Sequence, residues 1–227
     1  RDRLRSRGLG DVYKRQVKTY GIDNAADLLA KDITITNSYV DFMVKLETRN
    51  ERVKVGIPGR FSVYNALAAI SVCKKLGCSS ENIKKALEEV RVPGRSELVD
   101  NKKGLTIMID YAHSPESLQN ILYAVKSYTR GRVISVFGCG GDRDTTKRAI
   151  MGEISGKAAD YTIITSDNPR TENPEEIVKQ VEEGIKRTKG KYVCIVDRKK
   201  AIEHAIKMAN KNDIIVLAGK GHEPYQE

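Results

Sequence analysis

The sequence predicts an α/β protein in which a mostly parallel sheet follows a smaller region of short strands and helices. Beyond residue 104, five continuous apolar runs have the pattern of strands buried on both faces. Helical segments separate these runs, and strand–helix alternation repeated four times indicates a parallel sheet with right-handed crossovers. The region before RVPGRSE (91–97) instead alternates apolar and polar residues over short stretches, which is typical of half-buried strands.

The N-terminal region is expected to hold three strands and two helices. The strands are DITITN, YVDFMVKLETR and ERVKVGI, and we expect Asn50 in the turn between the last two. The segment PGRFSVYNALAAISVCKKLG then predicts an alanine-rich helix that stops at Gly77. A second helix is predicted from Ser79, whose side chain can cap it, to Val90.

Two helices of the C-terminal region have the same opening. Ser-Pro-Glu occurs at 114–116 and Asn-Pro-Glu at 173–175, and each triplet supplies a cap residue, a proline at the first helical position and an acid beside the positive helix end. The strands that these and the other helices separate are predicted at residues 105–110, 132–137, 161–165, 192–196 and 213–217.

The first sixteen residues, RDRLRSRGLGDVYKRQ, differ from the rest of the chain. They hold six basic and two acidic residues without apolar periodicity, so we interpret residues 1–16 as a non-native leader. They account for four of the ten net positive charges, and the remainder suits a protein that handles phosphates and carboxylates. Aromatic residues are sparse and bases are interspersed with acids, so a nucleic-acid partner has little support.

Composition also limits the cellular setting. No run of about 18 apolar residues occurs and the start lacks the apolar core of a signal peptide, so we expect a cytoplasmic protein without membrane insertion. Cys73, Cys78, Cys139 and Cys194 lie far apart and form no C-x-x-C pair. We therefore expect reduced thiols and no metal site.

Ionisable and glycine-rich clusters follow each predicted C-terminal strand. Ligands of parallel sheets bind beyond the carboxyl ends of the strands, so these clusters are expected to meet at one edge. A single cluster could be an ordinary turn or cap, but five at one edge indicate a shared site. The clusters are residues 110–113, 138–148, 166–170, 197–198 and 219–223.

The glycine-rich turn FGCGGDRDTTKR (137–148) does not match the common nucleotide-binding motifs. Arg143 stands where a dinucleotide-binding turn needs its third glycine, and G-x-x-x-x-G-K-[ST] occurs nowhere in the chain. The turn instead predicts exposed backbone amides at a helix start beside Arg143, Lys147 and Arg148. These groups suit a carboxylate or a phosphate.

Six ordered motifs resemble those of the Mur ligases, and more narrowly of the members that add 2,6-diaminopimelate. They are GRFSVYNALAA, VPGRSE, DYAHSPESL, FGCGGDRDTTKR, SDNPRTENP and AGKGHEPYQ, and the resemblance runs from about Val17 to the last residue. It implies that residues 17–92 are the tail of a central ATPase domain and that residues 93–227 are a Rossmann-like C-terminal domain, truncated at its end. The family's P-loop, UDP site and carbamylated lysine would lie upstream of Val17, which makes the chain a fragment.

The resemblance also implies roles for individual residues. Arg170 would clasp the distal carboxylate of diaminopimelate, and Glu223 would pair with an ammonium; lysine-adding relatives depart from arginine at this position. From their placement, Lys147, Arg143 and His113 are the catalytic candidates, the first two by neutralising charge. The nucleotide contacts implied are Asn65, Arg95 and Asp110. The diaminopimelate contacts implied are Arg148, Asp167, Asn168, Pro169, Arg170, Gly219 and Glu223.

The activity implied is ATP-dependent amide-bond formation with Mg²⁺. The terminal carboxylate of UDP-N-acetylmuramoyl-L-alanyl-D-glutamate would be phosphorylated, and the amine of diaminopimelate would then displace phosphate. A monomer is expected. Two alternatives stay open: a lysine-adding or folylpolyglutamate-synthase-like ligase, against which DNPR (167–170) argues, and a non-catalytic amino-acid-binding module, which the lack of a P-loop motif favours for the isolated chain.

Overall fold

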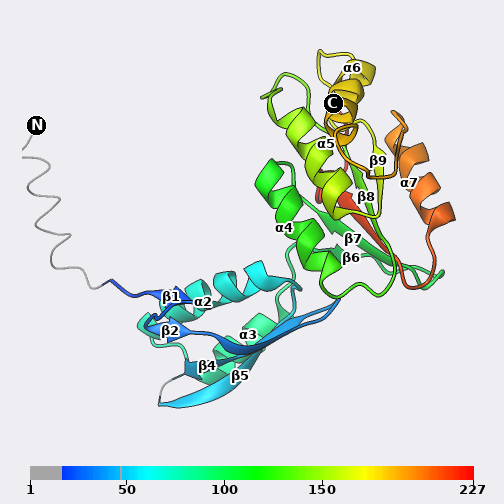
Figure 1. The fold of residues 1–227 in the computed structure, drawn as a ribbon. Coiled ribbons are helices and arrows are strands. Elements are labelled where there is room, and N and C mark those ends of the chain that lie inside the picture. The colour runs from blue at the N-terminus through cyan, green and yellow to red at the C-terminus, as the bar shows by residue number, and fades with distance from the viewer. Residues whose placement is uncertain (1–16, 47) are drawn as a thin grey trace, which may run out of the picture.

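The computed structural model describes residues 17–46 and 48–227 and confirms the α/β fold class. The predicted leader, residues 1–16, lies outside the described residues. Within the described residues there are a two-stranded, a three-stranded and a six-stranded sheet. Figure 1 shows the first two in an N-terminal part, drawn blue to teal, and the six-stranded sheet in a C-terminal part, drawn green to red.

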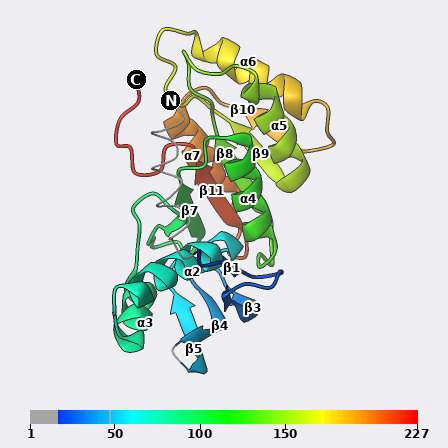
Figure 2. The ribbon, with the colours of Figure 1, turned by 90° about the vertical axis from the view of Figure 1, so that its left-hand side faces the viewer.

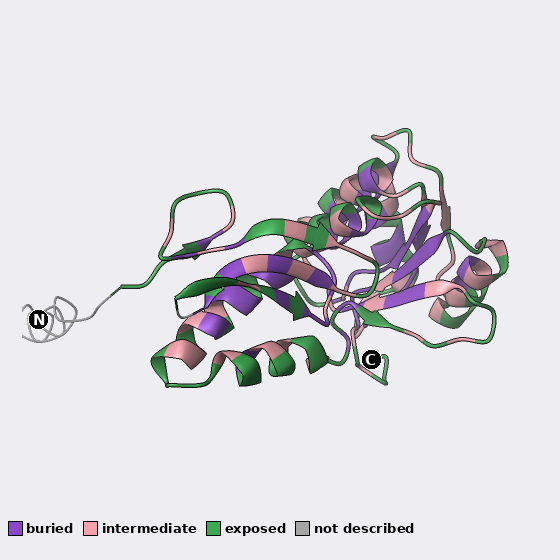
Figure 3. Cartoon of the chain, turned by 90° about the horizontal axis from the view of Figure 1, so that it is seen from below, coloured by how far each residue is buried: buried purple, intermediate pink, exposed green. Residues whose placement is uncertain are grey.

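The N-terminal part packs two helices on a small antiparallel sheet of order β3-β4-β5. Apolar residues at alternate positions of β4 face the helices, and Phe42 and Leu67 lie fully buried in this core. Figure 3 shows the buried residues gathered in the strands and on the helix sides that face them. The elements are β1 (Tyr20–Gly21), β2 (Leu28–Leu29), β3 (Lys31–Ile35), β4 (Val40–Leu46), β5 (Arg49–Val55), α2 (Arg60–Lys75) and α3 (Ser80–Glu89).

The predicted boundaries in this part are mostly confirmed. Gly77 follows the end of α2 in the left-handed region (φ 82°), and the Ser79 hydroxyl accepts a hydrogen bond from the Asn82 amide (3.3 Å) to cap α3. The turn predicted at Asn50 is wrong, because Asn50 lies in β5 opposite Lys45. The hairpin closes two residues earlier, where Leu46 pairs with Arg49.

The C-terminal part is a six-stranded sheet of order β10-β9-β8-β11-β7-β6, parallel except for the short β6. Because β11 pairs with both β7 and β8, the last strand is central and its following loop lies between the loops of earlier strands. The elements are β6 (Glu97–Leu98), β7 (Thr106–Asp110), α4 (Pro115–Lys126), β8 (Val133–Phe137), α5 (Lys147–Ala158), β9 (Tyr161–Ile164), α6 (Pro174–Ile185), β10 (Tyr192–Cys194), α7 (Arg198–Met208) and β11 (Ile214–Ala218).

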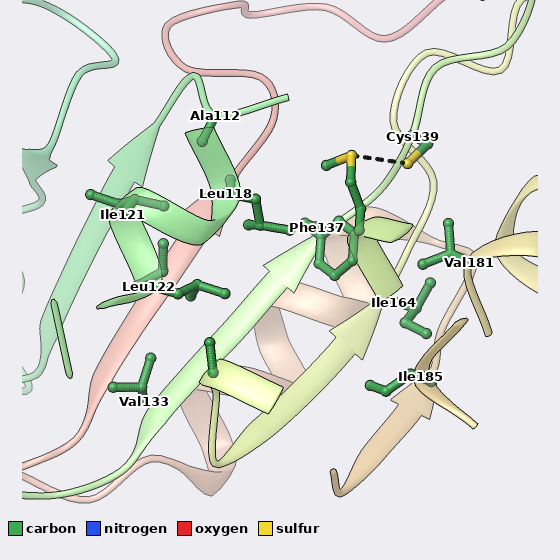
Figure 4. Packing of buried hydrophobic residues seen from close by; sticks show 14 of the residues in the cluster. Ala112, Leu118, Ile121, Leu122, Val133, Phe137, Cys139, Ile164, Val181 and Ile185 are labelled. Atoms are coloured by element: carbon green, nitrogen blue, oxygen red, sulfur yellow. Dashed lines mark hydrogen bonds between the residues drawn. The ribbon is translucent and has the colours of Figure 1, made fainter. Parts of the chain in front are cut away.

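Helices cover both faces of this sheet. α4, α5 and α6 bury one face, where Phe137 lies among residues of α4, β9 and α6 (Figures 2 and 4). α7 covers the opposite face and buries Ala201 and Ala205 against β8, β9 and β11. β8 is buried throughout, as predicted, but β10 is not: it has one neighbour in the sheet and leaves Cys194 exposed.

Caps and close helix packing fix the ends of α4, α5 and α6 near the carboxyl edge of the sheet. The Ser114 side chain accepts from the Ser117 amide, and Asn173 accepts from the Glu175 amide, so both predicted caps are confirmed. Gly152 of α5 meets the backbone of α6, and Gly184 of α6 meets the backbone of α5. A side chain at either glycine would strike backbone and force apart the two helices.

Two further features concern helix length and the cysteines. No helix among the described residues is both long and apolar enough to span a bilayer. The four cysteines are free thiols, and burial raises the pKa of Cys139 to about 12, which keeps this thiol protonated in the core.

Candidate functional site

A pocket of about 440 Å³ lies beyond the carboxyl ends of β7, β8, β9 and β11. Loops that follow these four strands line the pocket. We predicted this arrangement because ionisable and glycine-rich clusters follow the strands in the sequence. The wall combines basic and acidic side chains with two glycines. The lining residues are Tyr111, His113, Gly140, Arg143, Asp144, Lys147, Asp167, Asn168, Arg170, Gly219 and Glu223.

Arg148, expected to grip the substrate, does not line this pocket. Its guanidinium is fully buried between α5 and α6 and is held by the Glu172 carboxylate through two hydrogen bonds of 2.8 Å each. Gln180 Oε1 (2.8 Å) and the Gly140 carbonyl (3.1 Å) accept its remaining Nη hydrogen bonds. Arg148 lies in the first turn of α5, on the side of the helix that faces the protein interior, so its side chain does not reach the pocket. Arg143, in the preceding loop, is exposed and lines the pocket instead.

The Arg148–Glu172 pair joins the two loops that form one side of the pocket. Glu172 also accepts from the Asp142 amide (2.6 Å), and the Asp142 carboxylate accepts from the amide and the hydroxyl of Thr171. Hydrogen bonds from the Arg148 side chain and then from the Asp142 amide lower the pKa of Glu172 to about 2. The pair is therefore ionised at any physiological pH.

The glycines of the 138–141 turn let these loops approach closely. A side chain at Gly138 would strike the Thr165 carbonyl, and one at Gly141 would strike the Pro169 carbonyl. We predicted that the backbone amides of this turn are free to bind an anion. The Gly141 amide is not free, because it donates to the Asn168 carbonyl (2.8 Å). Pro169, expected at the substrate, contributes to this loop packing and does not line the pocket.

The position of Arg170 in the pocket wall is fixed by an unusual backbone conformation and by contacts of its guanidinium group. Its φ of 50° is in the left-handed region, which is costly for a residue with a side chain. Nη1 donates to the Gly141 carbonyl (2.7 Å), and Nε lies 3.3 Å from a Glu227 carboxylate oxygen. A guanidinium has five N–H donors, so these contacts leave donors for a carboxylate in the pocket.

Hydrogen bonds hold the Glu223 carboxylate in place in the pocket lining. The Glu223 carboxylate accepts from the Tyr111 hydroxyl (3.2 Å) at one oxygen and from the Asn168 amide (3.2 Å) at the other. Lys220, buried beneath it, lies 2.8 Å from Asn168 Oδ1 and 3.4 Å from Glu223. Burial raises the pKa of Glu223, but hydrogen bonds from Asn168 and Lys220 outweigh this effect, and the pKa lies below its usual value. Glu223 is therefore a carboxylate at neutral pH.

The catalytic candidates lie along the edge of the pocket near α5. Lys147 is half-buried, and its ammonium donates to the His113 carbonyl (2.9 Å). The His113 ring lies with Nδ1 2.8 Å from the Tyr111 carbonyl, a contact that requires Nδ1 to carry the proton. Arg143 forms no hydrogen bond or ion pair with any described residue, so its guanidinium is open to a ligand.

A second cavity, of about 380 Å³, lies at the joint between the two parts of the chain. It brings together the three predicted nucleotide residues, Asn65, Arg95 and Asp110, with an apolar wall that includes Phe61 and Ile121. The Asp110 carboxylate accepts from the Ser96 amide (2.8 Å) and the Ala112 amide (2.9 Å), so it also fixes the joint segment to the end of β7.

The fourth predicted cluster, residues 197–198, does not reach the pocket. Asp197 caps α7 by accepting from the Lys200 amide (3.0 Å). Arg198 donates to the carbonyls of Ser166 (3.2 Å) and Ala218 (3.0 Å), which supports two pocket loops from behind. Burial lowers the pKa of Arg198.

Four residues with a place in the site were missed from the sequence. Tyr111 and Lys220 lie inside clusters already identified, and Asp144 lies in the glycine-rich turn, but side-chain direction was not readable from those clusters. Glu172 follows DNPR by one position and gave no signal of its pairing with Arg148. Among residues 17–46 and 48–227, no group of three or more acidic, histidine or cysteine side chains could hold a metal ion.

Comparison with known proteins assigns the chain to a family. The family profile described as Mur ligase, glutamate ligase domain, matches residues 94–221, and the one described as Mur ligase middle domain matches residues 4–73. A curated relative from Caldanaerobacter subterraneus subsp. tengcongensis is named UDP-N-acetylmuramoyl-L-alanyl-D-glutamate–2,6-diaminopimelate ligase. It is 52% identical over 213 residues, which cover 94% of this chain and 44% of the relative. The chain thus spans less than half the length of this relative.

Solved structures agree with this assignment. A structure with the same enzyme name superposes with a TM-score of 0.67 at 32% identity and covers 100% of this chain and 47% of that one. The MurF ligase of Thermotoga maritima, solved in complex with ADP, has a TM-score of 0.69 at 19% identity over 93% of this chain and 46% of its own, which shows a shared fold. Because the glutamate ligase profile alone matches more than half of the residues and the relative matches nearly all of them, the chain belongs to the Mur ligase family.

Proposed function

We propose that this chain provides the amino-acid pocket of an ATP-dependent ligase that adds meso-2,6-diaminopimelate to UDP-N-acetylmuramoyl-L-alanyl-D-glutamate. The observation that carries the proposal is a single pocket lined by the guanidinium groups of Arg143 and Arg170 and by the hydrogen-bonded carboxylate of Glu223. The name of the relative at 52% identity supports the same substrate. In this proposal residues 17–92 complete a central ATP-binding domain and residues 93–227 form the C-terminal ligase domain.

The pocket matches the charge pattern of diaminopimelate. This amino acid has an ammonium and a carboxylate at each end, whereas lysine lacks the distal carboxylate. Arg170, with Arg143 beside it, would receive that carboxylate through paired N–H donors. Glu223, held ionised by Asn168 and Lys220, would receive an ammonium. Arg143 takes the place that the sequence had assigned to Arg148.

The chain's own residues would orient the amine and stabilise charge during the reaction. ATP, bound in the complete ligase, supplies the phosphoryl group that activates the acceptor carboxylate. Pocket residues would hold the attacking amine in a fixed position, which accounts for much of the rate enhancement in such reactions. Lys147, with its ammonium at the pocket edge, would neutralise the negative charge that develops as the amide forms.

The joint cavity suits the nucleoside end of ATP. Phe61 and Ile121 give an apolar wall for a base, while Asn65, Arg95 and Asp110 supply polar contacts. The ADP complex of the Thermotoga maritima ligase supports a nucleotide as the ligand. Since the described residues hold no cluster of metal ligands, they are not proposed to bind Mg²⁺ by themselves. With nucleotide substrates of this kind, we place the reaction in the cytoplasm.

Arg170 should decide between diaminopimelate and lysine. We expect the chain to bind meso-diaminopimelate more tightly than lysine in calorimetric titrations. Arg170→Ala should weaken diaminopimelate binding by about 1.5–3 kcal/mol, the usual worth of hydrogen bonds to a charged group, and should leave lysine binding unchanged. Arg130→Ala, an exposed residue before β8, is the control. Lysine bound as tightly as diaminopimelate by the unsubstituted chain would rule out the proposed substrate.

Lys147 should affect turnover more than binding. In a full-length Mur ligase that carries this chain, Lys147→Ala is expected to lower kcat roughly 100- to 1,000-fold, the range for removing one group that stabilises transition-state charge. The KM for diaminopimelate should change much less, because the ammonium acts on developing charge. Steady-state kinetics give both values, and Lys157→Ala on the exposed end of α5 is the control. An unchanged kcat would remove Lys147 from the catalytic residues.

The Glu172–Arg148 ion pair should stabilise the folded chain in a pH-dependent way. The folded pKa of Glu172, about 2, lies below the usual 4.5, so the pair stabilises the fold fully above pH 4.5 and loses this effect as pH falls towards 2. Urea unfolding should therefore show Glu172→Gln to be less stable than the unsubstituted chain at pH 7, with the difference shrinking below pH 4.5. Exposed Glu183→Gln is the control. A difference that is the same at pH 7 and pH 2 would contradict the ion-pair explanation.

A further inference from the structure

Tyr111 lies between the two cavities and is assigned to neither by the sequence motifs. It follows Asp110 at the end of β7, and adjacent residues in an extended chain direct their side chains to opposite sides. Asp110 accordingly lines the joint cavity, whereas Tyr111 lines the amino-acid pocket.

The Tyr111 side chain contacts one residue of each site. Arg95 lines the joint cavity, and its guanidinium carbon lies 4.6 Å from the centre of the Tyr111 ring, within cation–π range. At the other end of the ring, the hydroxyl donates a hydrogen bond of 3.2 Å to Glu223 Oε1. One rigid aromatic side chain therefore joins a proposed nucleotide contact to a proposed diaminopimelate contact.

Close backbone packing holds the ring in this position. Gly221 has φ 54°, and a Cβ there would lie 2.7 Å from Tyr111 Cδ2. Gly94, also in the left-handed region, packs against the backbone of Gly221 and His222, so the joint segment and the loop after β11 touch. His113 packs edge-on at 4.8 Å between ring centres. A shift of the joint segment therefore acts on the ring and on the Glu223 loop together.

The hydroxyl is a donor over the working pH range. The hydrogen bond to Glu223 and the charge of that carboxylate, together with burial, raise the pKa of Tyr111 above its usual value. The groups that face the hydroxyl and Glu223 are Arg95, Asn168 and Lys220, with Tyr225 nearby. The Tyr111–Glu223 hydrogen bond is consequently present at neutral pH.

We propose that Tyr111 is a positioning residue that aims Glu223 at the substrate ammonium and couples nucleotide binding at Arg95 to diaminopimelate binding. This inference rests on the proposed function. A nucleotide that draws the Arg95 guanidinium away from the ring would change the position of Tyr111 and hence of Glu223. By linkage, diaminopimelate must change nucleotide affinity by the same factor.

The test uses two substitutions in a full-length Mur ligase that carries this chain. Calorimetry measures meso-diaminopimelate affinity with and without saturating ADP. For the unsubstituted ligase we expect ADP to change this affinity by at least about threefold, a small but measurable coupling. Tyr111→Phe keeps the ring over which Arg95 lies and should weaken diaminopimelate binding about 5- to 10-fold, with ADP affinity unchanged. Tyr111→Leu should also abolish the effect of ADP.

Matched controls separate positioning from general damage. Tyr123→Phe removes the hydroxyl of an exposed tyrosine on α4 and should change neither affinity. Thermal unfolding should show Tyr111→Phe as stable as the unsubstituted ligase, since a purely structural role would lower stability and both affinities together. Unchanged diaminopimelate binding in Tyr111→Phe, or an ADP effect retained in Tyr111→Leu, would overturn the inference alone. No diaminopimelate binding by the unsubstituted ligase would overturn the proposed function, and the inference with it.

Discussion

The ion pair between Arg148 and Glu172 is the contact on which the pocket depends. It ties the first turn of α5 to the loop before α6 through two hydrogen bonds, and the Asp142 amide adds a third to the same carboxylate. Glu172 is partly exposed but the Arg148 guanidinium is buried, so removing Glu172 would leave a buried charge without its counter-charge, which costs more than losing an exposed pair. The two loops therefore keep a fixed separation.

The fixed distance between these two loops accounts for the unusual backbone conformations and the close backbone contacts around the pocket. Asp142 and Arg170 both have φ near 50°, a conformation that side-chain-bearing residues adopt only where surrounding contacts require it. Gly138 and Gly141 admit the facing loop without a clash. The buried Lys220 ammonium lies 2.8 Å from Asn168 Oδ1 and forms ion pairs with the carboxylates of Asp167 and Glu223.

Sequence patterns predicted the sheet, the helices and the edge at which the site lies, because apolar runs and cap motifs are local signals. They could not separate Arg143 from Arg148, which lie in one basic turn; only the exact start of α5 determines which one turns inward. The role of Tyr111 could not be predicted either, because its contacts Arg95 and Glu223 are distant in the sequence. The family resemblance supplied residue types and the proposed substrate, while the contacts among loops could be found only in the three-dimensional structure.

If loops after four strands form one pocket, a single bound amino acid should affect all four loops. An NMR titration of the isotopically labelled chain with meso-diaminopimelate tests it most directly. We expect the amide signals of residues 111–113, 140–143, 168, 170 and 219–223 to shift together and to fit one dissociation constant, while residues 197–198, which follow β10, stay unchanged. Shifts confined to one loop, or separate dissociation constants for different loops, would contradict it.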